Sequence, residues 1–327
     1  MRTDSMGALD SDPTIAWLMR GDPAIRWQTM RDLLSQPSQT WEAERKRVAQ
    51  TGWGVRLLNK QKPDGNWGRG PYHPKWTCTT YTMQVLRRLG LPPRHSAAVK
   101  ACRLYLSQGI GEDGGINFWK ARRPNSETCV TGIILSQLAY FKPRDVDLSG
   151  LVDYLLNEQM PDGGWNCERH NGAVHSSFHT TINVLEGLRE YILADGSRVS
   201  QAIQAEARGQ EFLLDHRLYR SSTTGNVVHP AMTRFHFPPR WRHDVLRALD
   251  HFQMAFTTPD QRMADAIDLV ISRRRKDGRW LLPSRYKGAV FFEMEVAAKP
   301  SRWNTLRALR VLNWWESKHA AAPRRPR

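Results

Sequence analysis

The phrase Gln-Lys-Pro-Asp-Gly-Asn-Trp at residues 61–67 and the phrase Gln-Met-Pro-Asp-Gly-Gly-Trp at residues 159–165 share one pattern, Gln-x-x-x-Gly-x-Trp. Each phrase lies between two amphipathic stretches. The two phrases begin 98 positions apart, which corresponds to two units of about 49 residues. The chain is therefore predicted to be a repeat protein.

Two weaker copies extend the series. They are Glu-Asp-Gly-Gly-Ile-Asn-Phe-Trp at residues 112–119 and Lys-Asp-Gly-Arg-Trp at residues 276–280, and in all four copies an acidic residue precedes the turn glycine. We interpret the phrase as an Asp-Gly turn whose Trp joins paired elements. The chain has 13 Trp residues, and packing between neighbouring units explains most of them better than ligand stacking does.

Apolar residues recur with the period of a helix, and this pattern predicts six helical hairpins. The second helices of the pairs are rich in apolar and small residues, which suits an inner ring, and the charged first helices suit an outer ring. We expect an all-α fold, an (α/α)6 toroid with a central cavity. The first helices are expected at 13–20, 41–61, 96–108, 147–159, 200–216 and 260–275, and the second at 25–35, 76–90, 127–141, 176–193, 241–256 and 302–316.

We expect one toroid domain over residues 1–319, interrupted by an inserted loop at about 217–240 and followed by a disordered basic tail at 320–327. A second architecture stays open, because residues 22–34 also read as a HEAT-type helical repeat. An open basic solenoid of such repeats would wrap nucleic acid.

The Gln-x-x-x-Gly-x-Trp phrases and the paired helices of about 50 residues resemble the terpenoid cyclase and protein prenyltransferase toroid superfamily, with repeats of the squalene-cyclase type. The resemblance covers residues 41–316. It implies an enzyme that binds an apolar, isoprenoid-like substrate in its central cavity.

The charge balance favours an acidic partner. The chain has 48 Lys and Arg against 32 Asp and Glu, a net charge of +16. Phosphate, diphosphate, nucleic acid and a membrane surface all fit this charge. We expect a small lipophilic or anionic ligand, keep peripheral membrane contact as a further partner, and do not favour nucleic acid. The oligomeric state is left open.

The chain has no apolar run of membrane-spanning length and no secretory apolar core near its start. Its four cysteines are not closely spaced in pairs, which is typical of free thiols in a reducing compartment. A cytoplasmic location is therefore expected.

A zinc site is expected where inner helices begin. Cys78, Cys129 and His179 take equivalent positions on successive inner helices. Protein prenyltransferases hold zinc with Asp-x-Cys at one inner helix and a His at the next, and the resemblance carries these roles to Glu127, Cys129 and His179, with Glu in place of Asp. Cys167, His175 and His179 form a second candidate set. The alternative is that the cysteines are small buried residues and the histidines bond to the backbone.

Helix N-termini converging at one mouth would attract an anionic head group. The residues expected to bind substrate there are Arg122, Arg123, Arg234, Arg240 and Trp241. Asp244 is a candidate acid or base acting with His243 or His229, although capping of the next helix is the simpler role for it. The simpler role of the arginines is that of solvated loop charges.

Neither familiar acid motif of the terpene cyclases is present, since the chain has no Asp-x-Asp-Asp and no Asp-Asp-x-x-Asp. Cyclisation by those acids is not expected. Our leading hypothesis is a terpene cyclase-like or prenyltransferase-like toroid enzyme in which zinc acts as a Lewis acid. The alternatives are a noncatalytic ligand-binding or interaction toroid and the nucleic-acid solenoid.

Overall fold

The computed structural model describes residues 12–319, and within them the regular structure is helical apart from three isolated bridges. The outer helices are α2 (Pro13–Met19), α4 (Ser38–Lys46), α5 (Gly52–Leu58), α7 (Ser96–Gly109), α9 (Ser149–Asn157), α11 (Val199–Asp215) and α13 (Ala264–Ser272). The inner helices are α3 (Pro23–Asp32), α6 (Thr79–Leu89), α8 (Thr128–Phe141), α10 (Phe178–Leu193), α12 (Val245–Met254) and α14 (Arg302–His319). These pairs confirm the six predicted hairpins. The short 3-10 helices are η1 (Arg47–Ala49), η2 (Arg169–Asn171), η3 (Pro230–Thr233) and η4 (Gln261–Met263).

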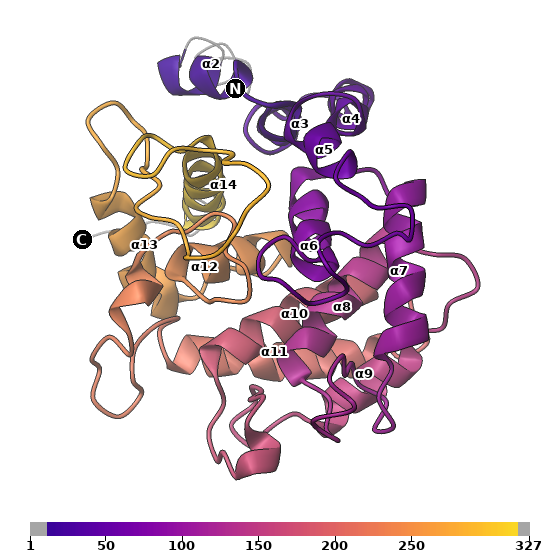
Figure 1. Ribbon diagram of the computed structural model, residues 1–327. Helices are drawn as coiled ribbons and strands as arrows, with labels where there is room; N and C mark the ends of the chain where they lie inside the picture. The colour runs from indigo at the N-terminus through magenta and orange to yellow at the C-terminus, as the bar shows by residue number, and fades with distance from the viewer. Residues whose placement is uncertain (1–11, 320–327) are drawn as a thin grey trace.

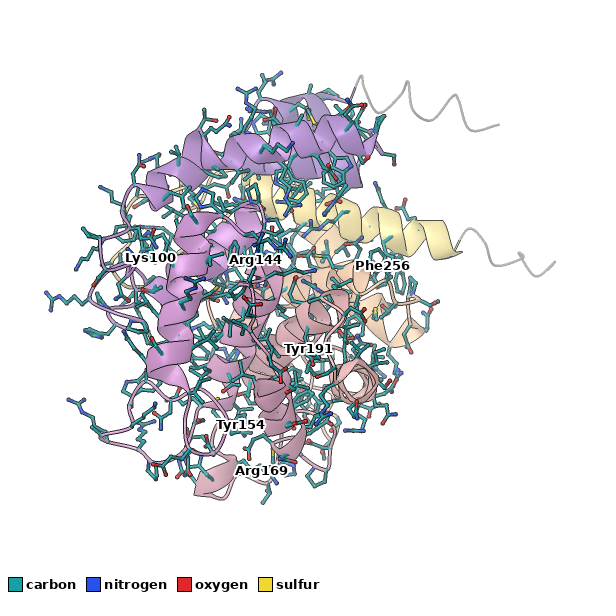
Figure 2. All side chains as sticks on the ribbon, turned by 90° about the vertical axis from the view of Figure 1, so that its right-hand side faces the viewer. Lys100, Arg144, Tyr154, Arg169, Tyr191 and Phe256 are labelled. Carbon is teal, nitrogen blue, oxygen red and sulfur yellow. The ribbon has the colours of Figure 1, made fainter. Side chains whose placement is uncertain are left out.

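The inner helices close into a ring (Figure 1). Helix α14 packs against α12 on one side and α3 on the other, and Figure 2 shows α14, in yellow, directly beside the N-terminal helices. Arg310 of α14 donates hydrogen bonds to Gln28 at 3.1 Å and to Asp32 at 3.0 Å, both on α3. The closed ring confirms the all-α toroid and excludes the open solenoid. The predicted tail 320–327 and residues 1–11 lie outside the described residues.

A buried Trp connects the outer and inner helix of three hairpins. The indole N–H groups of Trp67, Trp165 and Trp280 each donate a 2.7 Å hydrogen bond to a carbonyl ten residues earlier, in the last turns of α5, α9 and α13. Their backbone N–H groups bond to threonine hydroxyls of the next inner helix, namely Thr79, Thr181 and Thr305, at 3.0 to 3.1 Å. Each Trp is fully buried and therefore fixes both helices of its pair.

The Gln of the phrase connects neighbouring hairpins. The Gln61 amide donates to the Gly65 carbonyl at 2.9 Å and to the Ala97 carbonyl of α7 at 2.8 Å. Gln159 repeats this pattern with Gly163 and Ala205 of α11. The turn needs glycine because Gly65 has a φ of +91°, where a side chain would be strained.

The copy at residues 112–119 is offset from the expected register. Ile116, not Trp119, takes the buried position, and its N–H bonds to the Thr131 hydroxyl at 2.9 Å. Trp119 is partly exposed and meets Tyr72 edge-on with ring centroids 4.8 Å apart. The physical reason is the spacing from the turn glycine: the residue that enters the core follows Gly114 by two positions in this copy, as Trp67 follows Gly65.

The segment between α11 and α12 contains the predicted insertion and has only one short helix, η3. It folds into the ring, where the ring of Phe237 stacks on Trp303 of α14 with centroids 4.2 Å apart. Among the described residues, we find no helix with the length and apolar character needed to cross a membrane.

We expect Trp165→Phe to lower the free energy of unfolding by about 1–3 kcal/mol, because the buried Leu155 carbonyl loses its donor. Chemical denaturation would measure the change. Trp119→Phe is the matched control and should cost about 1 kcal/mol or less. An equal loss in both variants would contradict the assignment of Trp165, and not Trp119, to the position that joins two helices.

Candidate functional site

A cavity of about 210 Å³ lies on the axis of the ring, and each of the six inner helices contributes to its wall. The lining consists mainly of arginines, carboxylates and aromatic rings. Its members are Trp27, Gln28, Arg31, Arg45, Arg87, Arg88, Tyr140, Glu186, Arg189, Glu190, Leu193, Phe237, Arg247, Asp250, His251, Met254, Trp303, Arg307 and Arg310.

Positive charge exceeds negative charge in this lining. Eight arginines face three carboxylates, and Asp32, which pairs with Arg31 and Arg310 from behind the wall, raises the acids to four. Many of these residues lie in the C-terminal halves of their helices, where the helix dipole favours cations. The wall of the cavity therefore carries an excess of guanidinium groups over carboxylates.

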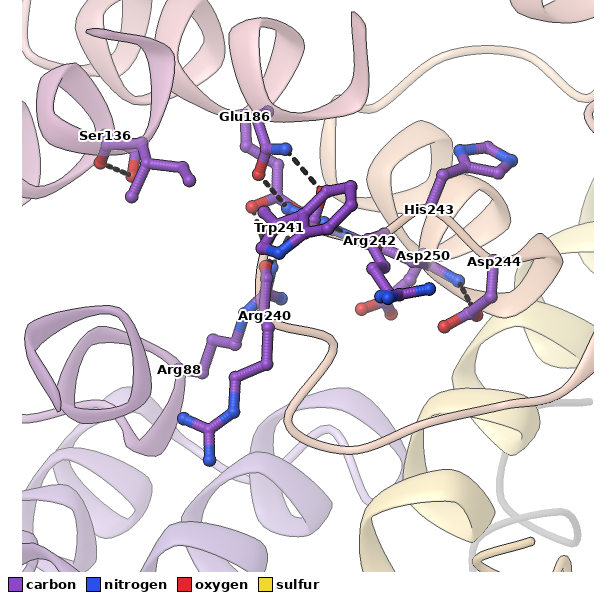
Figure 3. Close-up of polar contacts among 12 residues, drawn as sticks. Arg88, Ser136, Glu186, Arg240, Trp241, Arg242, His243, Asp244 and Asp250 are labelled. Carbon is purple, nitrogen blue, oxygen red and sulfur yellow. Dashed lines mark hydrogen bonds and ion pairs between the residues drawn. The ribbon is translucent and has the colours of Figure 1, made fainter. Parts of the chain in front are cut away.

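Glu186 of α10 is the centre of one ion-pair network (Figure 3). Its carboxylate accepts hydrogen bonds from Arg88 of α6 at 2.7 Å and from Arg247 of α12 at 2.8 Å, and Arg87 approaches it at 3.2 Å. Burial alone would raise the pKa of Glu186, but the three arginines outweigh burial and hold the pKa well below its usual value. The network ties three inner helices together.

Asp250 of α12 is the centre of a second network. Arg310 binds both of its oxygens, at 2.6 and 2.7 Å. Arg307, one turn earlier on α14, has its Nε 3.4 Å from the same carboxylate but not in hydrogen-bonding geometry. All three Arg307 nitrogens are buried without a hydrogen-bond acceptor, and the residue is only 2% exposed. Arg307 thus presents an unused forked donor at the cavity.

His251 adds no charge to the cavity at neutral pH. Burial lowers its pKa to about 3, with a further contribution from Arg189, and neither ring nitrogen has a hydrogen-bond partner. Glu206 of α11 lies 3.6 Å from it, and burial raises the pKa of that carboxyl to about 7. The positive charge of the site therefore comes from the arginines.

The other end of the ring is aromatic and nearly filled. Trp76 and Tyr81 meet edge to face at 4.7 Å, and the buried Arg240 guanidinium lies 5.2 Å above the Trp76 ring. Chain from the segments preceding α12 and α14 occupies the remaining space, so two small hollows of about 40 and 30 Å³ are left around Arg240. These hollows are too small for an isoprenoid chain.

The arginines that the sequence selected for substrate binding do not meet in one place. Arg122 and Arg123 border a surface hollow of about 340 Å³ whose lining side chains are all exposed, and Arg234 is also exposed. Arg240 is buried against Trp76, and burial lowers its pKa to about 10. Trp241 contacts the His179 ring at 5.1 Å. None of these five residues lines the central cavity.

The three candidate catalytic residues make separate contacts and do not interact with one another. Asp244 caps α12 by accepting a 2.9 Å hydrogen bond from the Arg247 N–H, and its other oxygen is buried without a partner. Burial raises the pKa of this carboxyl. His243 points away from Asp244 (Figure 3) and bonds to the Leu218 carbonyl at 2.7 Å, while burial lowers its pKa to about 3. His229 is exposed and its Nδ1 caps the N–H of Ala231.

The predicted zinc ligands do not assemble as a set. Within residues 12–319 no three His, Cys, Asp or Glu side chains are grouped so that they could hold a metal ion. The His179 Nδ1 already accepts the His243 N–H at 2.9 Å, His175 is exposed, and Glu127 pairs with Arg123 at 3.4 Å. The arrangement does not fit zinc as it stands, and zinc dependence stays a prediction from the sequence.

One pair within that set does come together. The Cys129 N–H donates to the Cys167 sulfur at 3.1 Å. The neighbouring Cys129 side chain lowers the pKa of Cys167. Cys78, by contrast, is buried with Trp76 and Tyr81.

The sequence prediction did not select the cavity residues, because it considered the functional role of each charged residue separately. A periodic signal was nevertheless present in the apolar inner helices. Glu186, Arg189 and Glu190 of α10 are spaced as i, i+3 and i+4, and Arg247, Asp250 and His251 of α12 repeat the spacing. Residues so spaced share one helix face. A polar stripe on a buried helix indicates a polar interior.

Comparisons with known proteins bear on this ring. No protein-family model matches the chain. A stretch of 128 residues, 38% of the chain, is 30% identical to the drimenyl diphosphate synthase of Streptomyces showdoensis. The match spans 24% of that protein, so it covers about a quarter of the relative's length.

Two solved structures are similar over most of their lengths. A type II terpene cyclase from Scytonema in complex with merosterolic acid A is 13% identical, with a TM-score of 0.48 over 97% of this chain and 100% of that chain. A protein from Actinoplanes is 14% identical, with a TM-score of 0.45 over 90% of each chain. By its repeat phrases, its hairpin ring and the matched stretch, the chain resembles the terpenoid cyclase-like helical superfamily.

We expect Glu186→Gln to lower the free energy of unfolding by about 3–5 kcal/mol, because buried arginines lose their counter-charge. Denaturant titration at neutral pH would measure the loss. Glu158→Gln is the matched control, since the Glu158–Arg169 pair is partly exposed, and it should cost about 1 kcal/mol or less.

The ion pairs of Glu186 also predict how the stability difference between wild type and Glu186→Gln depends on pH. The pKa of Glu186 is lower in the folded protein than its unfolded value of 4.5, so its stabilisation is complete above pH 4.5 and is lost as the pH falls through the folded pKa. The stability difference between wild type and Glu186→Gln should therefore shrink on acidification. A difference that grows at low pH would contradict the ion-pair network.

Proposed function

We propose that the protein binds a compact phosphorylated anion, with a diphosphate group as the preferred head, in the central cavity of its toroid. The observation that carries the proposal is Arg307, a buried guanidinium whose three nitrogens lack acceptors in a wall where arginines outnumber carboxylates two to one even when Asp32 is counted. Phosphate and diphosphate oxygens suit such a fork because they accept paired, charge-assisted hydrogen bonds.

The free-energy cost of burying these guanidinium groups supports the proposal. A buried donor without an acceptor costs about 1–3 kcal/mol, so a guanidinium with three unbonded nitrogens is costly unless a ligand accepts its hydrogen bonds. Arg87, Arg88 and Arg189 also each have a buried Nε without an acceptor. A bound anion would bond to these donors and offset the cost of burying them.

The aromatic side of the cavity limits the tail that a bound diphosphate can carry. Trp27, Tyr140, Phe237 and Trp303 contribute ring surface to the wall. Since the hollows beyond Phe237 are only about 40 and 30 Å³, an isoprenoid tail would have to leave toward the rim near Leu193, which is 58% exposed. An isoprenoid diphosphate is therefore held by its head and not enclosed by the ring.

A second candidate function is enzymatic conversion of such a ligand. The similarity to a drimenyl diphosphate synthase favours it, although the match covers about a quarter of that protein. The chain's own residues offer Asp244, whose raised pKa and unpartnered oxygen suit a proton donor. Asp244 does not line the central cavity, so conversion would require a further movement of the chain, and we rank binding first.

We expect calorimetric titration to show binding of inorganic diphosphate and of farnesyl diphosphate to the full chain. Arg307→Met should weaken both by about tenfold or more, because a charge-assisted fork contributes about 1.5–3 kcal/mol. The free variant should be close to wild type in stability, because three buried donors without acceptors are removed and Asp250 keeps both hydrogen bonds from Arg310. A structural role alone would instead lower the stability.

Arg122→Gln is the matched control, because Arg122 borders the exposed hollow and its variant should bind as wild type does. Binding of neither anion by wild type would overturn the proposal. Equal weakening in Arg122→Gln and Arg307→Met would place the site elsewhere. Appearance of a new isoprenoid product on incubation with farnesyl diphosphate would favour the enzymatic candidate over simple binding.

A further inference from the structure

A second chemical site lies away from the central cavity, where the loop after α9 meets the start of α8. Cys167 belongs to that loop and Cys129 is the second residue of α8, 38 positions earlier. The Cys129 N–H donates to the Cys167 sulfur at 3.1 Å. The two sulfur atoms are therefore neighbours in the folded chain.

The loop sulfur is held in place from two helices. The Thr180 hydroxyl of α10 donates to the Cys167 sulfur at 3.5 Å and accepts the Cys167 N–H at 3.3 Å. The fold thus brings together two cysteines that the sequence separates widely.

These two cysteines also differ from the other two in how deeply the residue is buried. Cys129 and Cys167 are half-buried, whereas Cys78 and Cys102 are fully buried. Cys78 is packed with Trp76 and Tyr81, and Cys102 lies within the main core.

We propose that Cys129 and Cys167 form a redox site that a hydroperoxide oxidises to an intramolecular disulfide. The Cys167 sulfur attacks the outer oxygen of the hydroperoxide, the O–O bond breaks, and the alcohol leaves with one proton. The Cys129 sulfur then attacks the resulting sulfenic acid, the S–S bond forms, and water leaves. Two thiols lose two electrons and two protons, and the hydroperoxide becomes one alcohol and one water.

The disulfide would fasten the loop to the first turn of α8. The same loop carries Glu168 and His170, which border the exposed hollow with Arg122 and Arg123. Oxidation would thereby fix that surface, while the central cavity at the other end of the inner helices keeps its shape. This inference is independent of the proposed anion binding.

The test is mild oxidation of the native, reduced full chain with hydrogen peroxide, followed by unfolding, alkylation and peptide mass mapping. We expect two of the four thiols to be lost and one cross-linked peptide pair, joining Cys129 to Cys167, lighter by two hydrogens. The melting temperature of the oxidised protein should rise, because the link restricts the unfolded chain.

Cys102→Ser is the matched control and should give the same link and the same rise in melting temperature. Cys129→Ser and Cys167→Ser should give neither, with circular dichroism confirming that they fold. Retention of all four thiols in oxidised wild type, a link involving Cys78 or Cys102, or oxidation to a sulfinic acid without any link would each overturn the proposal.

Discussion

One Trp residue connects the two helices of each hairpin in which it occurs. Its indole N–H bonds to the end of the outer helix, and its backbone N–H bonds to the start of the inner helix. Trp67, Trp165 and Trp280 make these two bonds with nearly identical distances. Since a buried indole must find an acceptor, the helix end is the nearest partner it can use. The angle between outer and inner helix follows from this requirement.

The ring that results has a polar centre. Each hairpin turns one face of its inner helix toward the axis, and these faces carry arginines and carboxylates on α6, α10, α12 and α14. Glu186 joins α10 to its neighbour α12 and to α6, which lies beyond α8, and Asp250 joins α12 to α14. These ion pairs stand where the sequence predicted an apolar cavity. The same charges that hold the ring together leave the three nitrogens of Arg307 without hydrogen-bond acceptors.

Interior polarity also sets this ring apart from the apolar cavity that the sequence predicted. The aromatic end of the ring is occupied by the protein's own chain, with Phe237 stacked on Trp303, and the open volume lies among the arginines. Fold and function are separate questions in such a case, because the scaffold sets where a cavity lies and the side chains set what it accepts.

Local pattern was enough to predict the hairpins, their inner and outer order and the closed ring, because helix period and the Gln-x-x-x-Gly-x-Trp turn are properties of short stretches of chain. Local pattern was also enough to place Asp244 at a helix start, where it caps α12. The register of the weaker copy could be decided only by packing, which buries Ile116 and leaves Trp119 at the surface. The meeting of Arg307 with Asp250, and of Cys129 with Cys167, required the tertiary structure, because closure of the ring brings distant helices together and burial then decides which charges find a partner.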